Sequence, residues 1–276
     1  MTMKILGTSR LTAFLKAVNR LPFPVTVRHE QTFGEQTDHL KDQELDSPEA
    51  WDELRRANPQ FSVSTDRAEW LKACNSEIKK DGQDGRIVER ASAVANVLRA
   101  NGIQRIFSVG VGGAGLEYHL KRLMPELKIV ATEYAPENVE LLRKVFIECD
   151  ELRVFDILHG DWSEAIDPHL KTMVLMYRVD PHFTDAEWRG VFERMKRAGV
   201  KNILYIPCGF LTLKSFFQRR ARARRWRTEG KKVVFAGYLR TRTQFLKYWK
   251  GLYVARSYDL GGFEGFALQS ENDLLT

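Results

Sequence analysis

The stretch "IFSVGVGGAGLEYHL", residues 106–120, places four glycines between an apolar run and a run with helical spacing. Such an order predicts a buried strand, a tight turn and a helix. Glycine lets the backbone adopt left-handed conformations and come close to another group. The turn therefore predicts either a ligand that approaches the backbone or, as the alternative, close packing of the helix on the strand.

From residue 86 onward, helical and strand patterns alternate. Apolar strands are expected at 105–111, 128–133, 152–157, 172–178 and 202–207, with helices between them. This alternation predicts a parallel sheet covered on both faces. Residues 252–270 instead predict two strands joined by Asp-Leu-Gly-Gly, and so an antiparallel edge. The expected fold is α/β, a Rossmann-like doubly wound sheet that is mostly parallel, with an antiparallel C-terminal edge.

Residues 1–85 differ from the rest because prolines interrupt them and their polarity is high. Ser47 and Pro48 begin one predicted helix, and Thr65 begins another. The turn "DGQDG" at residues 81–85 marks a boundary. We expect a mainly helical or irregular extension at 1–85, acting as a lid or as a homodimer contact. Residues 86–276 then form one domain with a basic insertion at 209–232.

The composition excludes several classes of protein. The chain has 276 residues, 43% of them hydrophobic, and its apolar runs are shorter than a membrane span. Three dispersed cysteines and six scattered histidines give neither a disulfide framework nor a metal motif. A cytoplasmic protein without a metal is therefore expected. The net charge of +7 arises in one segment, because residues 214–232 carry nine basic residues and one acidic residue.

The glycine turn and a later acidic residue together predict a bound cofactor that contains adenosine. Gly110, Gly112 and Gly115 satisfy the G-x-G-x-x-G pattern, and Glu133 ends the second strand 18 residues after Gly115. In this arrangement, backbone N–H groups approach the cofactor and the carboxylate accepts the ribose hydroxyls.

Two further motifs resemble class I S-adenosylmethionine-dependent methyltransferases. They are "ATEYAPENVELLRK" at residues 131–144 and "HGDW" at residues 159–162, and the resemblance extends over residues 86–270. It implies S-adenosylmethionine as cofactor and S-adenosylhomocysteine as product, with Asp161 at the adenine amino group and Trp162 against the adenine ring. The cofactor residues expected on these grounds are Ser108, Gly110, Gly112, Gly113, Gly115, Glu133, Tyr134, Asp161, Trp162 and Tyr177.

One residue departs from the pattern of that family. Ser108 stands where the family usually has an acidic residue, which helps to hold the ammonium group of the cofactor. A serine carries no charge, so either the affinity is reduced or another acid, Glu117 or Asp156, takes this role.

The segment "YRVDPHFT" at residues 177–184 leaves the fourth strand at its carboxyl end, where the acceptor is expected. His182 is the candidate base because its unperturbed pKa is near neutrality, and Asp180 orients it or acts alone. Arg178 is assigned to the substrate. The alternative is that Asp180 and Pro181 only form a turn, with His182 packed behind it.

The basic insertion at 209–232 predicts an amphipathic helix with aromatic residues on one face and arginines on the other. Such a helix suits an anionic membrane surface, RNA, or an acidic substrate such as a sugar nucleotide or a pyrophosphoryl lipid. A solvated helix whose aromatic residues pack on the sheet is the alternative. Arg219 and Arg220 are assigned to the substrate because the insertion follows the fifth strand and so flanks the acceptor site.

Residues 235–268 resemble methyltransferase-like proteins of bacterial cell-surface polysaccharide pathways, which implies a lipid-linked glycan acceptor and peripheral contact with a membrane. The leading hypothesis is therefore methyl transfer to a hydroxyl of a small-molecule or lipid-linked glycan acceptor. An RNA methyltransferase is disfavoured because the fourth strand leads into Val-Asp-Pro-His instead of Asn/Asp-Pro-Pro-aromatic. Two more hypotheses stay open, an NAD(P)-binding oxidoreductase-like protein and a catalytically silent cofactor-binding module.

Overall fold

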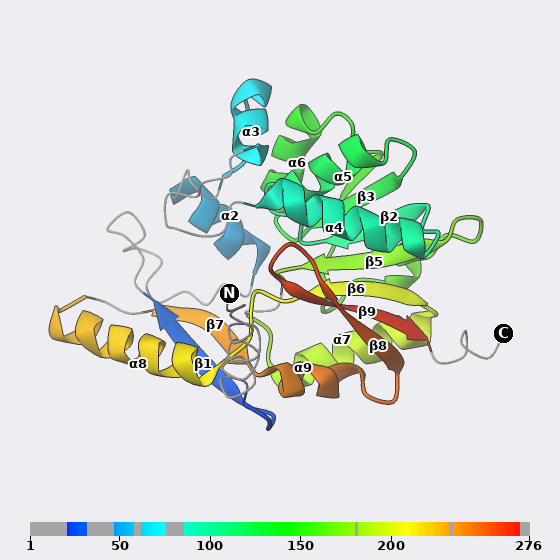
Figure 1. The fold of residues 1–276 in the computed structure, drawn as a ribbon. Coiled ribbons are helices and arrows are strands. Elements are labelled where there is room, and N and C mark those ends of the chain that lie inside the picture. Colours follow the sequence, from blue (N-terminus) through cyan, green and yellow to red (C-terminus); the bar gives the residue numbers. More distant parts are fainter. Residues whose placement is uncertain are drawn as a thin grey trace, which may run out of the picture.

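The computed structural model describes residues 21–31, 47–57, 62–75, 86–179, 182–231 and 234–270. Its centre is a seven-stranded sheet with the order β4-β3-β2-β5-β6-β9-β8 (Figure 1). The five predicted strands are its parallel part: β2 (Arg105–Val109), β3 (Lys128–Glu133), β4 (Glu151–Val154), β5 (Thr172–Tyr177) and β6 (Asn202–Ile206).

The antiparallel edge follows the prediction from the last residues. β8 (Tyr253–Asp259) and β9 (Glu264–Ser270) form a hairpin, and β9 returns to lie antiparallel between β6 and β8. The expected Rossmann-like fold class is thereby confirmed.

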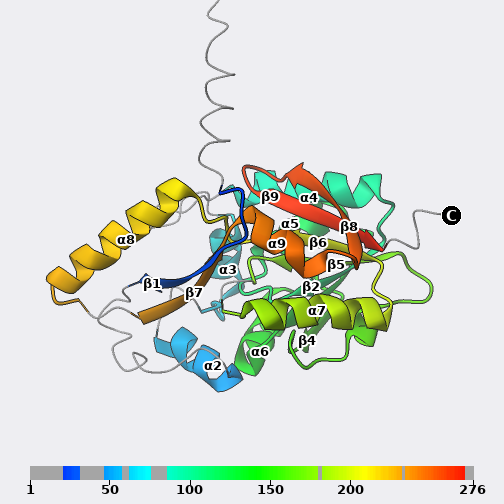
Figure 2. The same ribbon diagram turned by 90° about the horizontal axis from the view of Figure 1, so that it is seen from below.

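Helices cover both faces of the sheet (Figures 1 and 2). α4 (Ile87–Ala100) and α5 (Gly115–Leu123) pack their apolar side chains on one face, beside α6 (Pro136–Val145). The short 3-10 helix η3 (Trp162–Ala165), α7 (Asp185–Ala198) and α9 (Arg242–Trp249) cover the other face. α7 has the predicted capping box of Thr184 and Glu187 and ends at Gly199 in the left-handed region.

The order of the strands fixes where a ligand enters. The chain leaves β2 toward β3 on one side, whereas β5 lies on the other side of β2. Helices that leave neighbouring strands in opposite directions open a crevice at the carboxyl ends of those strands. The glycine turn after β2 lies at this crevice.

The N-terminal residues add two helices, as predicted, and one strand that the sequence did not indicate. α2 (Pro48–Ala57) begins after Ser47, whose Oγ accepts from the Ala50 N–H at 3.2 Å, and α3 (Arg67–Cys74) begins after Asp66. β1 (Thr26–Gln31) pairs antiparallel with β7 (Val234–Arg240) in a separate two-stranded sheet. The extension is therefore not only helical, because part of it completes a sheet with the C-terminal part of the chain.

The basic insertion forms α8 (Leu213–Thr228), which lies along β1 to one side of the main sheet (Figures 1 and 2). We call α8, β1 and β7 the side unit. The alternative in which the aromatic residues of this helix pack on the main sheet does not hold: Leu213 and Phe217 are 42% and 60% exposed, and no side chain of α8 is buried. Phe210, which precedes the helix, packs on Phe245 and Phe266 in the main core instead.

One carboxylate joins the side unit to the main domain. Asp185, at the start of α7, accepts hydrogen bonds from Thr26 Oγ1, Gln244 Nε2 and Tyr248 Oη at 2.6 to 2.9 Å. It also forms an ion pair of 2.9 Å with Arg240, which is fully buried. These bonds lower the pKa of Asp185, and they join β1, β7, α7 and α9 at one point.

Candidate functional site

The glycine turn lies between β2 and α5 and requires two of its glycines for their backbone conformation. Gly110 and Gly112 have φ angles of +66° and +57°, which side chains disfavour. A Cβ atom on Gly110 would lie 2.6 Å from Val179 Cγ1, so the end of β5 closes that side of the turn. At Gly112 and Gly113 a Cβ atom would meet nothing within 4 Å. The backbone beside these two residues therefore faces open space.

Glu133 lies at the end of β3, next to this turn, and its side chain is buried. Its carboxylate accepts the Gly112 N–H at 2.8 Å and the Tyr134 N–H at 2.9 Å. It also forms an ion pair of 3.2 Å with Arg55, a residue of α2. The structure thus brings Glu133, Tyr134 and the glycine turn together.

Asn138 binds the carbonyl group of Gly112, the residue whose N–H group Glu133 accepts. Its Nδ2 donates to the Gly112 carbonyl at 2.8 Å, and its side chain is buried in the first turn of α6. Sequence reasoning gave it no role, although it belongs to the "PEN" of the recognised motif. That motif was the signal for this residue.

Ser108 and Glu117 form one buried unit beneath the turn. The Ser108 hydroxyl donates to Glu117 Oε1 at 2.6 Å, and burial raises the pKa of Glu117 to about 7. The other candidate for the missing acid, Asp156, accepts from the Leu158 and His159 N–H groups and pairs with the His159 ring at 2.8 Å. Of the two acids, only Glu117 bonds to Ser108.

The two residues expected at the adenine ring differ in exposure. Asp161 is exposed and caps η3 by accepting the Ser163 N–H at 2.9 Å. The ring of Trp162 is 2% exposed and packs on Phe155 and Phe107, with ring centroids 5.0 and 6.4 Å apart. The Trp162 side chain therefore belongs to the core on the α7 side, because its large apolar surface is more stable there than at an open edge.

Tyr177 and Arg178 leave β5 toward the opposite side of the sheet from α7. The Tyr177 hydroxyl accepts from Arg90 Nη1 at 2.6 Å, and the Arg178 guanidinium lies 5.9 Å from the ring of Phe263. Arg178 has a φ of +60°, which is unusual for a residue other than glycine. Asp180 lies outside the described residues.

His182 is half-buried between two aromatic rings. Its imidazole makes edge contacts with Trp51 of α2 at 5.4 Å and with Phe235 of β7 at 6.1 Å. Burial lowers the pKa of His182 to about 4, so its imidazole is neutral near pH 7. A neutral imidazole has a free nitrogen lone pair that can accept a proton.

α2 crosses the carboxyl edge of the sheet from Glu133 to His182. Arg55 pairs with Glu133, Trp51 covers His182, and Asp52 accepts the Glu137 N–H at 3.4 Å at the start of α6. Sequence reasoning missed Arg55 and Trp51. They are spaced as residues on one face of any amphipathic surface helix are, and no motif in the neighbouring sequence distinguishes them.

Arg219 and Arg220 lie apart from this crevice. Both line a cavity between α8 and β1, to which the glycine turn contributes no residue. The structure therefore divides the predicted site residues into two groups. No cluster of three or more potential metal ligands occurs among the residues that the structure describes.

The crevice residues fit an adenosine group. The open side of Gly112 and Gly113 provides room beside backbone N–H groups, and the buried Glu133 carboxylate provides the acceptor that ribose hydroxyls need. The Glu133 carboxylate already pairs with the Arg55 guanidinium, so it can accept hydrogen bonds from groups other than backbone N–H.

No protein-family model matches the sequence, and no curated protein matches it. Among solved structures, the fold is similar to that of several methyltransferases. Human N-acetylserotonin methyltransferase, in complex with S-adenosylmethionine, is 16% identical with a TM-score of 0.44; the match covers 80% of this chain and 66% of that chain.

The magnesium protoporphyrin IX methyltransferase of Synechocystis PCC 6803, with bound S-adenosylhomocysteine, is 11% identical over 74% of this chain and 94% of its own, with a TM-score of 0.49. An amino pentose methyltransferase from Micromonospora echinaspora, bound to S-adenosylmethionine, is 13% identical over 76% and 99%, with a TM-score of 0.47. At these identities, the similarity concerns the fold.

Proposed function

We propose that this protein transfers a methyl group from S-adenosylmethionine to a hydroxyl of a small-molecule or lipid-linked glycan acceptor. The observation that carries the proposal is β9, which lies antiparallel beside β6, in a sheet whose glycine turn adjoins a buried carboxylate. A dinucleotide-binding sheet continues with a sixth parallel strand at this position. The topology therefore favours an adenosyl cofactor other than NAD(P).

In this proposal, each residue of the crevice has one task. The backbone of Gly112 and Gly113 approaches the cofactor, and the Glu133 carboxylate binds the ribose hydroxyls. Glu117, bonded to Ser108, replaces the acid that Ser108 lacks. When bound, S-adenosylmethionine would supply a methyl group on a sulfonium; an aligned acceptor oxygen would take this methyl group as the carbon–sulfur bond breaks, and S-adenosylhomocysteine would leave.

His182 accepts the proton of the acceptor hydroxyl. Burial lowers the pKa of His182 to about 4, which keeps the imidazole neutral near pH 7 and also makes it a weaker base than a solvated histidine, whose pKa lies nearer the optimum for proton transfer. Trp51 covers one side of the ring and limits the access of water. We also propose that the exposed arginines of α8, together with exposed Leu213 and Phe217, contact an anionic membrane surface.

Isothermal titration calorimetry with S-adenosylmethionine, S-adenosylhomocysteine and NAD(P)H tests the cofactor. The wild type should bind the two sulfur compounds, and Glu133→Ala should bind them on the order of 10- to 100-fold more weakly, because two hydrogen bonds to a charged group are lost. Glu140→Ala is the matched control, since Glu140 is an exposed glutamate of α6.

Binding of NAD(P)H alone would overturn the methyltransferase proposal. If no cofactor binds while circular dichroism shows a folded chain, the crevice is a silent module. For the membrane contact, cosedimentation with phosphatidylglycerol vesicles should be lost when Arg219, Arg220, Arg222 and Arg224 are replaced by glutamate. Equal sedimentation of both proteins would rule that contact out.

A further inference from the structure

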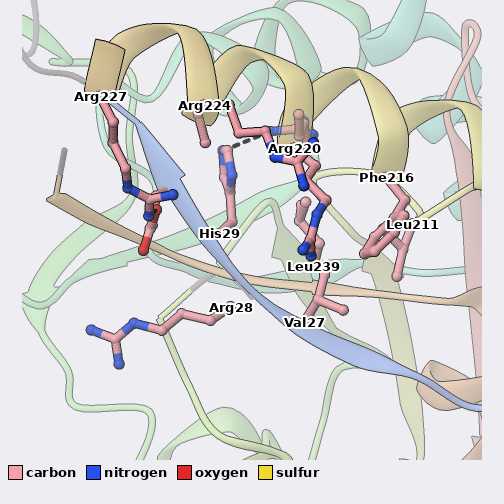
Figure 3. Close-up of a pocket in the computed structure, with 12 residues that line it drawn as sticks. Val27, Arg28, His29, Leu211, Phe216, Arg220, Arg224, Arg227 and Leu239 are labelled. Atoms are coloured by element: carbon pink, nitrogen blue, oxygen red, sulfur yellow. Dashed lines mark hydrogen bonds and ion pairs between the residues drawn. The ribbon is translucent and has the colours of Figure 1, made fainter. Parts of the chain in front are cut away.

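The cavity between α8 and β1 has a volume of about 270 Å³ (Figure 3). Its apolar lining includes Leu211, Phe216 and Leu239. Four arginines of α8 line the same space, at positions 219, 220, 224 and 227. Residues 220, 224 and 227 follow one another at intervals of one helical turn, so they share the face of α8 that looks toward β1. The cavity therefore combines an apolar wall with a row of guanidinium groups.

Two of these arginines have partners on β1. Arg227 forms an ion pair with Glu30, and Arg219 Nη1 donates to His29 Nε2 at 2.6 Å. Figure 3 shows His29 pointing from β1 toward α8. Burial and the nearby Arg219 and Arg222 lower the pKa of His29 to about 4. The ring is therefore neutral near pH 7 and does not offset the positive charge of the arginines. Among the described residues that line the cavity, Glu30 is the one carboxylate.

Arg220 and Arg224 are not neutralised in this way. Neither pairs with a carboxylate among the residues that the structure describes. Like charges one helical turn apart destabilise a helix, so the arrangement is costly without an anion between them. The planar fork of each guanidinium matches the oxygens of a phosphate group, to which it can donate two parallel hydrogen bonds.

One aromatic residue links the two-stranded sheet of the side unit to His182. Phe235 of β7 contacts His182 at 6.1 Å on one side, and the guanidinium of Arg28 lies 4.2 Å from the centre of its ring. Arg28 points away from α8 (Figure 3), so it lies on the face of the two-stranded sheet opposite His29. Cationic groups thus stand on both faces of β1, between the α8 cavity and His182.

We propose that this cavity binds a phosphate or diphosphate group of the methyl acceptor. The assignment of this ligand to the acceptor rests on the proposed function, whereas binding of the anion itself does not. The substrate class is then a phosphorylated glycan, either a free nucleotide sugar or a sugar on a polyprenyl diphosphate. Arg220 and Arg224 bind the phosphate oxygens, and the apolar wall accommodates the neighbouring part of the molecule.

Calorimetric titration of the full chain with inorganic pyrophosphate tests this assignment. The double variant Arg220→Gln/Arg224→Gln should bind pyrophosphate about 10-fold or more weakly than the wild type, because charge-assisted hydrogen bonds are removed. The control Arg197→Gln/Arg225→Gln removes the same charge at exposed positions outside the cavity, and its affinity should stay within about 2-fold. Equal losses in both double variants, or no binding by the wild type, would overturn the proposal.

Further titrations identify the source of the phosphate and separate this proposal from the first. Binding of uridine diphosphate supports a nucleotide sugar, and binding to phosphatidylcholine vesicles that carry a polyprenyl diphosphate supports a lipid-linked one. Tight, strongly salt-dependent binding of a single-stranded RNA without pyrophosphate binding would contradict both sources. Both double variants should bind S-adenosylhomocysteine as the wild type does. If this cofactor binds and pyrophosphate does not, only the present proposal fails.

Discussion

Glu117 makes the stability of the protein depend on pH in a way that one substitution should remove. Its side chain is buried, and its pKa is about 7 instead of the ordinary 4.5. Folding raises the pKa of this acid, so the folded protein binds the proton more tightly than the unfolded chain does. The stability that results is fully present below pH 4.5 and is lost as the pH rises to 7. At about 1.36 kcal/mol per pKa unit, the loss is roughly 3 kcal/mol.

Glu117→Gln keeps an oxygen that can accept the Ser108 hydrogen bond, but it cannot ionise. We would measure the free energy of unfolding by urea denaturation at pH 5 and at pH 8. From pH 5 to pH 8, this free energy should rise by about 2 to 3 kcal/mol in the variant relative to the wild type. Glu140→Gln, at an exposed glutamate, should show no such gain. A difference between Glu117→Gln and wild type that stays constant within about 0.5 kcal/mol would refute the reasoning.

Three further outcomes follow from the contacts around the crevice and the side unit. Arg55→Met should tighten binding of S-adenosylhomocysteine by about 5-fold or more in calorimetry, because the ribose no longer competes with a guanidinium for Glu133. Asp185→Asn should lower the free energy of unfolding by about 2 to 4 kcal/mol, since it removes the charged carboxylate that pairs with the buried Arg240 guanidinium. The lowered pKa of Asp185 means that its contribution is present at neutral pH and is lost as the pH falls below about 3.8. NMR titration should show His182 protonating near pH 4, and Trp51→Ala should move this midpoint toward 6.5 by exposing the ring.

Matched controls decide these three cases. Arg56→Met, next to Arg55 but in an exposed ion pair, should leave cofactor affinity unchanged. Weaker binding in Arg55→Met would instead make Arg55 a cofactor ligand. Glu193→Gln, on the same helix as Asp185, should cost less than about 1 kcal/mol. A His182 midpoint near 6.5 in the wild type would show that the ring is solvated.

The main sheet was predictable because its signals are local. Each strand from β2 to β6 is a short apolar run, and prolines, glycines and capping residues mark the ends of the helices between them. Gly112 and Glu133 were recognisable for the same reason, since their spacing follows from one strand–turn–helix unit. The contact between them needed no information from the rest of the chain.

The features that the sequence did not indicate depend on distant partners. β1 contains one strongly apolar residue, Val27, and becomes a strand because β7 pairs with it from more than two hundred residues away. Trp162 follows the acidic Asp161 in a polar loop, and this local sequence does not indicate burial. Its ring is buried because Phe107 and Phe155, from other parts of the chain, pack against it. Arg55 acquires its partner only when α2 crosses the sheet edge.

The pairing of β1 with β7 also imposes an order on folding. During synthesis β1 leaves the ribosome first, but its partner is made only after the whole parallel part of the sheet. Since domains tend to fold as their residues emerge, the side unit should close last, on a parallel sheet that has already formed. Because no side chain of α8 is buried, this helix should exchange its amide hydrogens by local unfolding while the main sheet stays protected.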